Sequence, residues 1–167
     1  VRIWWRTGEG TYRRNLRLPA KEENGTTKGV DADLADRVTK ENLDEAAAFA
    51  KAFAGKMNAV VAITGAIDIV ADAEKAYCIY NGRPEMSSIT GTGCQLSALT
   101  AAFVTANQEQ PLEAAAAAVC AMGLAGETAY ARLSELDGNA TYRNYIIDAI
   151  YRMNGEALEA GAKFEVR

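Results

Sequence analysis

The spacing of apolar positions changes along the chain, and each change predicts a different element. One helical face is expected at Leu43, Ala46, Ala47, Ala50 and Phe53. Gly55 is a suitable C-terminal stop for this helix. Residues 59–63 are then continuously apolar, which is typical of a strand covered on both faces, as in a parallel sheet. A helix followed by a buried strand at 59–64 is half of a β-α-β unit.

Two shorter apolar runs, "AIDIVAD" and "KAYCIY", predict a hairpin near a sheet edge, closed by the turn residues Asn81–Arg83. Helical spacing then returns three times, at about 93–106, from Pro111 onward and at 142–153. Gly123 and Gly126 within the second of these helices each cost about 1 kcal/mol relative to alanine. We therefore expect close packing against that helix to compensate.

The first 22 residues show no sustained period of either kind, and they predict an irregular segment. The remaining residues, 23–167, predict a folded α/β layered domain whose C-terminal half is largely helical. A chain of 167 residues, 49% of them hydrophobic, is long enough for one domain with a core of its own.

The composition excludes several kinds of site. The chain has no histidine, which removes Ser-His and Cys-His catalytic pairs and most transition-metal sites. Its three cysteines are far apart, so neither a zinc site nor a disulfide framework is expected, and they suit a reducing compartment. A net charge of -4 without a basic stripe argues against nucleic acid. No apolar run approaches the roughly 20 residues of a membrane span, and no signal peptide is recognisable, so a cytoplasmic protein is expected.

The stretch "ITGTGCQL", Ile89 to Leu96, carries the strongest chemical signal. Gly91 and Gly93 leave backbone N–H groups uncovered by side chains, and the helix that follows adds its own unpaired N–H groups and the positive end of its dipole. This pattern favours an anion site suited to phosphate. Three simpler interpretations stay open: a tight turn alone, a buried Cys94, and a redox-sensing thiol at a helix start.

Three acidic residues are weaker candidates. Asp68 and Asp72 alternate on a predicted strand and are potential metal ligands, although solvated charges on an edge strand are the favoured interpretation. Glu127 lies in the middle of a predicted helix, where an exposed face is the simplest interpretation.

The sequence "AVVAITGAIDIVAD" followed by "SSITGTGCQLSALTAAF" resembles the C-terminal half of hydroxyethylthiazole kinases, members of the ribokinase-like superfamily. "TKGVDA" (27–32) and "LAGETA" (124–129) extend the resemblance over residues 23–153. It implies a ribokinase-like three-layer fold truncated at the N-terminus. It also implies phosphorylation of the hydroxyl of 4-methyl-5-(2-hydroxyethyl)thiazole by ATP and Mg²⁺, in thiamine biosynthesis or salvage.

The resemblance also implies roles for individual residues. Thr64 and Gly65 match a nucleotide-binding element, and Gly91 matches a glycine that contacts the thiazole alcohol. The residues Gly91, Thr92, Gly93 and Cys94 form the implied anion hole. Cys94 stands at the position of the general base, where sister sugar and pyrimidine kinases usually carry aspartate or another residue. Positioning and charge neutralisation would supply most of the catalysis. No residue is assigned to a metal.

Members of this family are normally longer at the N-terminus and form trimers with sites between subunits. The additional part carries sheet strands, the thiazole pocket and a segment serving ATP and magnesium. We therefore expect residues 1–22 to be foreign to the family and one side of strand 59–64 to lack a neighbour, which would promote self-association. Two alternatives to the kinase remain: an inactive remnant that binds nucleotide weakly or only packs against subunits, and a kinase for a related alcohol.

Overall fold

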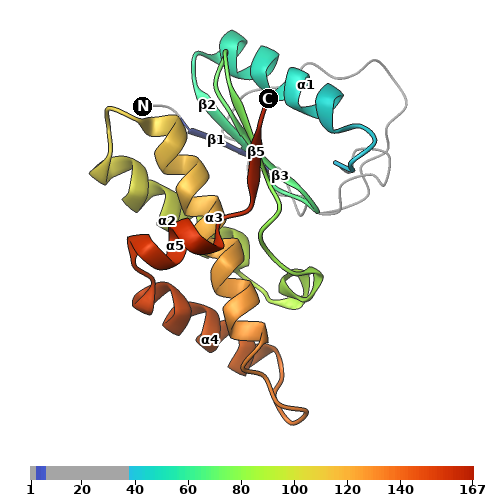
Figure 1. Cartoon of the computed structure of the whole chain (residues 1–167), viewed down its shortest axis with the longest axis vertical. Coiled ribbons are helices and arrows are strands. Elements are labelled where there is room, and N and C mark those ends of the chain that lie inside the picture. Colours follow the sequence, from blue (N-terminus) through green and yellow to red (C-terminus); the bar gives the residue numbers. More distant parts are fainter. Residues whose placement is uncertain (1–2, 7–37) are drawn as a thin grey trace.

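The computed structural model describes residues 3–6 and 38–167, in which one sheet lies between two helical layers (Figure 1). The elements in chain order are β1 (Ile3–Arg6), α1 (Leu43–Met57), β2 (Val60–Ile63), β3 (Asp68–Ala71), β4 (Ala76–Ile79), the 3₁₀ helix η2 (Pro84–Ser88), α2 (Thr92–Ala106), α3 (Pro111–Tyr130), α4 (Asn139–Arg152), α5 (Gly155–Gly161) and β5 (Phe164–Val166). The predicted strand at 59–64 and the predicted helices are confirmed, and the C-terminal half is helical apart from β5.

The described strands form a sheet in the order β1-β2-β3-β4-β5. Only β1 and β2 are parallel, and the three other pairs are antiparallel. The β3–β4 hairpin is confirmed, but it is closed by the turn from Asp72 to Lys75 and not by Asn81–Arg83, which follow β4. Its predicted place near a sheet edge is also wrong. The strand β5 pairs with the outer side of β4, through Cys78 opposite Glu165, and β3 is the middle strand.

The N-terminal segment differs from its prediction where the structure describes it. Residues 3–6 form β1, which pairs with β2 in parallel, with Trp4 opposite Val61. The predicted unpaired side of β2 is therefore wrong, and with it the reason given for self-association. Residues 7–37, which include the "TKGVDA" stretch, lie outside the described residues. The division of the chain at residue 22 remains a prediction.

Each face of the sheet is covered by a helix, as the continuous apolarity of β2 predicted (Figure 1). On one face α1 buries Leu43, Ala47 and Ala50 against Ile69 and Ala71. It ends at Asn58 rather than at Gly55, because Asn58 adopts the left-handed conformation, with a φ of 47°, that terminates a helix. The helices α2, α3, α4 and α5 occupy the other side.

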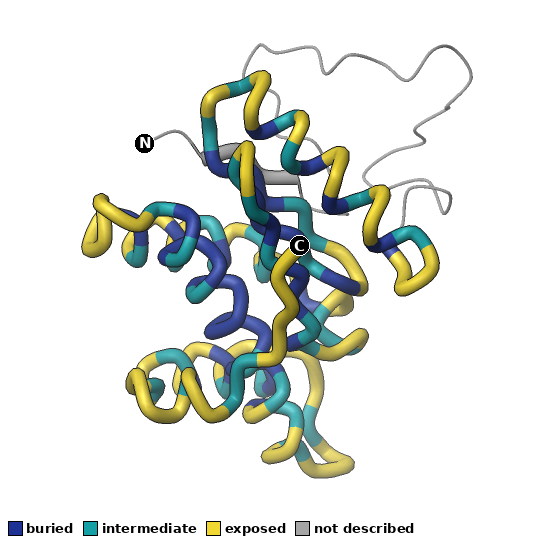
Figure 2. The backbone as a smooth tube through the Cα atoms, turned by 45° about the horizontal axis from the view of Figure 1, so that its top comes forward, coloured by how far each residue is buried: buried dark blue, intermediate teal, exposed yellow. Residues whose placement is uncertain are grey.

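The helix α3 is the centre of the second layer, and Figure 2 shows it buried along most of its length. In the described part of the chain it is the one helix long and apolar enough to cross a membrane, yet most of it is enclosed by the fold, as in a core helix. Its two glycines are packed closely. A Cβ at Gly123 would lie 2.6 Å from the Cβ of Asn81, and a Cβ at Gly126 would collide with the side chain of Met86. The predicted close packing is confirmed.

Candidate active site

The glycine motif ends as predicted, at the start of a helix. Gly91 adopts a left-handed conformation, with a φ of 94°, and α2 begins at Thr92. The first backbone hydrogen bond of the helix runs from the N–H of Gln95 to the carbonyl of Gly91. The N–H groups of Thr92, Gly93 and Cys94 precede it and point out of the helix start, where no side chain of residues 38–167 caps them. The positive end of the α2 dipole faces the same space.

The space beside the Cα of Gly91 is open as far as the described residues are concerned. A Cβ added at Gly91 would meet no atom within 4 Å, so the glycine is required for its backbone conformation and leaves room in front of α2. Cys94 is exposed, whereas the two other cysteines are buried. The interpretation of Cys94 as a small buried hydrophobe is therefore wrong, and its thiol is accessible to a ligand at the helix start.

The sheet brings the two predicted parts of the site, Thr64–Gly65 and the glycine motif, to the same end of its strands. The strands β2 and β4 point in the same direction, because each is antiparallel to β3 between them. Thr64 and Gly65 follow the carboxyl end of β2, and the segment leading to the glycine motif follows the carboxyl end of β4. Ligands of open α/β sheets generally bind at such ends.

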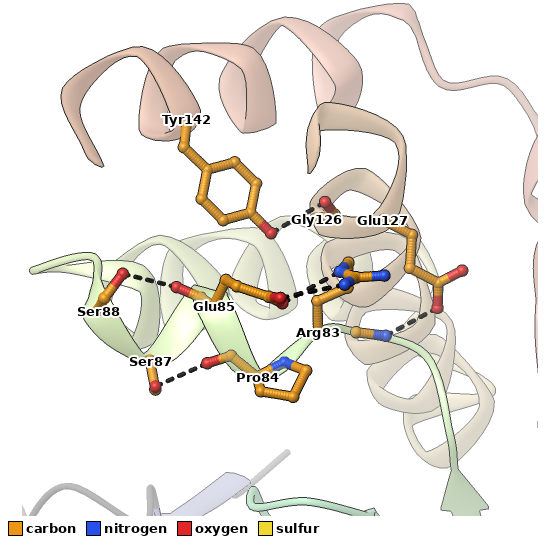
Figure 3. Close-up of polar contacts among 9 residues, drawn as sticks. Arg83, Pro84, Glu85, Ser87, Ser88, Gly126, Glu127 and Tyr142 are labelled. Atoms are coloured by element: carbon orange, nitrogen blue, oxygen red, sulfur yellow. Dashed lines mark hydrogen bonds and ion pairs between the residues drawn. The ribbon is translucent and has the colours of Figure 1, made fainter. Parts of the chain in front are cut away.

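The segment between β4 and α2 is fixed to α3 (Figure 3). Arg83 lies with its guanidinium 3.9 Å from the ring centroid of Tyr130, and it forms an ion pair with Glu85 at 3.0 Å. The side chain of Met86 covers Gly126. Tyr142 reaches over from α4 and donates a hydrogen bond to the carbonyl of Gly126. The contacts of Arg83 with Tyr130 and of Met86 with Gly126 hold η2 against α3, next to the glycine motif.

Glu127 also joins α3 to the segment that follows β4, contrary to its predicted place on a solvated face. Its carboxylate accepts from the N–H of Gly82 at 2.9 Å and from the ammonium of Lys163 at 2.6 Å. Asn81, which is buried, adds a longer hydrogen bond and holds the carbonyl of Gly161. Burial would raise the pKa of Glu127, but the Lys163 ammonium and the Gly82 N–H outweigh it and keep this pKa below its usual range. The network ties β4, α3 and the α5–β5 junction together.

Asp68 is half-buried on the middle strand, so its predicted place as a solvated edge charge is also wrong. Its Oδ1 accepts a hydrogen bond from the N–H of Gly65 at 2.8 Å. Burial raises the pKa of Asp68 to about 7, even though the Gly65 N–H acts in the opposite direction. The charge of Asp68 in turn contributes to the raised pKa of Cys120 on α3, behind the burial of that thiol.

Asp72 and Asp68 do not form a metal site, because they cap turns at opposite ends of β3. Asp72 accepts from the N–H groups of Glu74 and Lys75 and closes the β3–β4 turn. Within residues 3–6 and 38–167, no three Asp, Glu or Cys side chains gather closely enough to hold a metal ion.

Comparison of the sequence with known proteins identifies the relatives of this chain. The model of the hydroxyethylthiazole kinase family matches residues 16–156. This chain belongs to the hydroxyethylthiazole kinase family. The hydroxyethylthiazole kinase of Clostridium acetobutylicum is 57% identical over 141 residues, which are 84% of this chain and 52% of that protein. Hydroxyethylthiazole kinase 2 of Methanosphaera stadtmanae is 38% identical over 82% of this chain and 48% of its own length.

A solved structure supports the same assignment. The structure of the hydroxyethylthiazole kinase protein from Pyrococcus horikoshii OT3 superposes with a TM-score of 0.67 at 33% identity, over 76% of this chain and 48% of that chain. The ribokinase-like layered fold implied by the resemblance is thus confirmed. The chain spans about half the length of the hydroxyethylthiazole kinases that it matches.

The half-buried carboxylate of Asp68 predicts that Asp68→Asn is more stable than wild type at high pH. The amide retains an acceptor for the N–H of Gly65 and carries no charge. Full desolvation raising a carboxyl pKa to about 7 would cost about 4 kcal/mol, and the partial exposure of the side chain lowers this to about 2 kcal/mol. We expect a gain of that size at pH 8, measured by urea unfolding.

The gain should depend on pH with a defined sign. The unfolded Asp68 ionises at lower pH than the folded one, so the wild type loses stability as pH rises from about 4 to about 7. The advantage of Asp68→Asn should vanish below about pH 4. Cys120 is the titratable group that senses this charge from α3, and it stays protonated throughout this range because its own pKa is about 11. Asp72→Asn, at the exposed turn, should show no gain, and an equal gain there would contradict the assignment.

Proposed function

We propose that this chain is the part of a kinase that binds phosphate and carries the general base. The kinase transfers the γ-phosphoryl group of ATP to the hydroxyl of 4-methyl-5-(2-hydroxyethyl)thiazole. The observation that carries the proposal is the start of α2. An exposed thiol, three uncapped N–H groups and an open space beside Gly91 meet there. The relatives are named as hydroxyethylthiazole kinases, which fits this chemistry.

In the proposed reaction the N–H groups of Thr92, Gly93 and Cys94 stabilise negative charge on the phosphoryl group in the transition state. The hydroxyl oxygen of the alcohol bonds to the γ-phosphorus, and the bond from that phosphorus to the β–γ bridging oxygen breaks. The hydroxyl proton passes to the thiolate sulfur of Cys94, which becomes a thiol, and ADP leaves with the bridging oxygen. Thr64 and Gly65, at the same edge of the sheet, contact the nucleotide.

The open helix start fits a polyphosphate, since backbone N–H groups and a helix dipole bind such anions without a cationic side chain. Bound Mg²⁺ would neutralise further phosphate charge in this reaction, and no described residue is assigned to it. By analogy with the family, the active site is completed between the subunits of a trimer. The location proposed for this trimer is the cytoplasm.

The proposal predicts that the purified chain forms ADP and the thiazole phosphate from ATP, Mg²⁺ and the thiazole alcohol. Phosphorus NMR of the product checks this directly, and a reaction without the alcohol measures uncoupled ATP hydrolysis. Nucleotide binding without turnover would favour the non-catalytic alternative, in which the chain only binds nucleotide weakly or packs against subunits. Turnover of another small alcohol but not of the thiazole alcohol would favour the related kinase.

A further inference from the structure

The turn between β2 and β3 contains an acidic residue to which the proposed reaction assigns no role. Asp68 is the first residue of β3, and Thr64 and Gly65 directly follow β2. The only hydrogen bond of the Asp68 carboxylate within the described residues comes from the N–H of Gly65, at 2.8 Å. The carboxylate thus spans the turn and holds the first peptide group after β2.

This single contact fixes the orientation of a whole peptide plane. The described chain contains no cis peptide bond, so the carbonyl of Thr64 points opposite to the N–H of Gly65. When that N–H is turned toward Asp68, the Thr64 carbonyl must face away from Asp68. The conformation of Thr64 at the exit of β2 is therefore coupled to the Asp68 side chain, although the two residues are four positions apart in the sequence.

A role in capping the turn does not by itself explain the position of the Asp68 carboxylate. Asp72 performs the same task in the β3–β4 turn, where its carboxylate accepts two N–H groups beside exposed residues. Asp68 is half-buried, as Asp72 is, but it lies within the middle strand, on the side of Cys120 and α3, and it accepts a single N–H. A half-buried carboxylate with a perturbed pKa, beside the strand end where the nucleotide is proposed to bind, is a candidate for a functional role.

We propose that Asp68 is a positioning residue for the nucleotide: its carboxylate holds the Thr64–Gly65 peptide in the orientation that receives ATP. The inference rests on the proposed function, since it takes Thr64 and Gly65 as the nucleotide contact. It assigns Asp68 no contact with substrate and no proton transfer.

The test compares three variants by nucleotide affinity, by KM for each substrate and by thermal unfolding. Asp68→Ala removes the acceptor, and we expect the KM and the calorimetric Kd for ATP to rise about 10-fold or more, the effect of losing a hydrogen bond to a charged group. The KM for the alcohol should stay within about twofold. Asp68→Asn retains an acceptor and should restore ATP affinity to within about threefold of wild type.

Asp72→Ala is the matched control, because it removes a turn-capping carboxylate from the opposite end of the same strand. It should lower the melting temperature and leave the affinity for ATP unchanged. If Asp68→Ala does not fold, Asp68→Ser replaces it, since a hydroxyl on the shorter side chain cannot reach the N–H of Gly65 at the present distance. It should weaken ATP binding in the same way.

The outcomes separate this role from the proposed function. A folded Asp68→Ala that binds ATP as tightly as wild type would overturn the positioning role and leave the kinase proposal intact. Equal losses of affinity for both substrates, not restored in Asp68→Asn, would show a purely structural role and overturn it too. A wild-type chain that binds no ATP in calorimetry would overturn the proposed function itself, and the positioning role with it.

Discussion

Gly123→Ala is expected to lower the free energy of unfolding by about 3 kcal/mol or more, which is at the upper end for overpacking of a core. The added Cβ would lie 2.6 Å from the Cβ of Asn81 and 2.7 Å from its carbonyl carbon and oxygen. Two of these atoms are backbone, so a side-chain rotation cannot relieve the contact. Moving Asn81 would break its hydrogen bonds to Gly161 and Lys163. The gain of about 1 kcal/mol in helix propensity does not offset this.

Two further glycines provide graded controls, measured by the same urea unfolding. Gly126→Ala meets only the flexible side chain of Met86, which can change rotamer, so we expect a loss of about 1 kcal/mol. Gly155→Ala meets no atom within 4 Å at the start of α5 and should be neutral or slightly stabilising. If Gly123→Ala were as stable as Gly155→Ala, α3 could not pack this closely against Asn81.

The elements that the sequence predicted correctly are those with local signals. The start of α2 follows from two glycines before an apolar helical stripe, and the positive φ of Gly91 is the conformation that glycine favours there. The two glycines of α3 predicted close packing because their cost in helix propensity demands compensation. Each of these inferences depends only on residues within one or two turns of the chain.

The two outer strands could not be predicted, because their pairing is non-local. Residues 3–6 carry no alternation, and β1 exists through its pairing with β2 more than 50 residues later. The strand β5 has three exposed residues and forms against β4, nearly 90 residues earlier. Because none of its three residues is buried, β5 gives no periodicity to detect.

The acidic residues were misplaced for a related reason. A helical or alternating pattern shows which residues share a face, but not which polar partner stands opposite. Glu127 is held by Gly82, 45 residues earlier, and by Lys163, 36 residues later. Asp68 was assigned to an edge because the whole hairpin was expected near one, and its burial follows from the place of β3 between β2 and β4.

The roles of Thr64, Gly65 and Gly91 to Cys94 remain predictions from family resemblance. The structure adds physical support of different strength to each. Gly91 has its positive φ and open space, and Cys94 has its exposure at the helix start. Thr64 and Gly65 have their position at the carboxyl end of β2 and the hydrogen bond to Asp68. Kinetics of variants are therefore needed most at Cys94, whose proposed role is chemical.

Cys94→Ala is expected to lower kcat by about 10²- to 10⁴-fold with little change in KM, because a general base acts mainly in the transition state. The thiol is exposed, so its removal leaves no core cavity, and the melting temperature should stay within about 2 °C of wild type. A smaller loss of kcat would mean that the N–H groups of α2 provide most of the catalysis. Steady-state kinetics and a thermal melt on the same preparation separate loss of chemistry from loss of fold.

Cys94→Asp is the matched variant, and it should keep or raise the activity that alanine removes. Aspartate is ionised at neutral pH without assistance, and at the first turn of α2 its charge interacts favourably with the helix dipole. The side chain faces solvent, so no buried charge is created. Full activity in Cys94→Ala, or an inactive but folded Cys94→Asp, would exclude Cys94 as the base and leave α2 as an anion site alone.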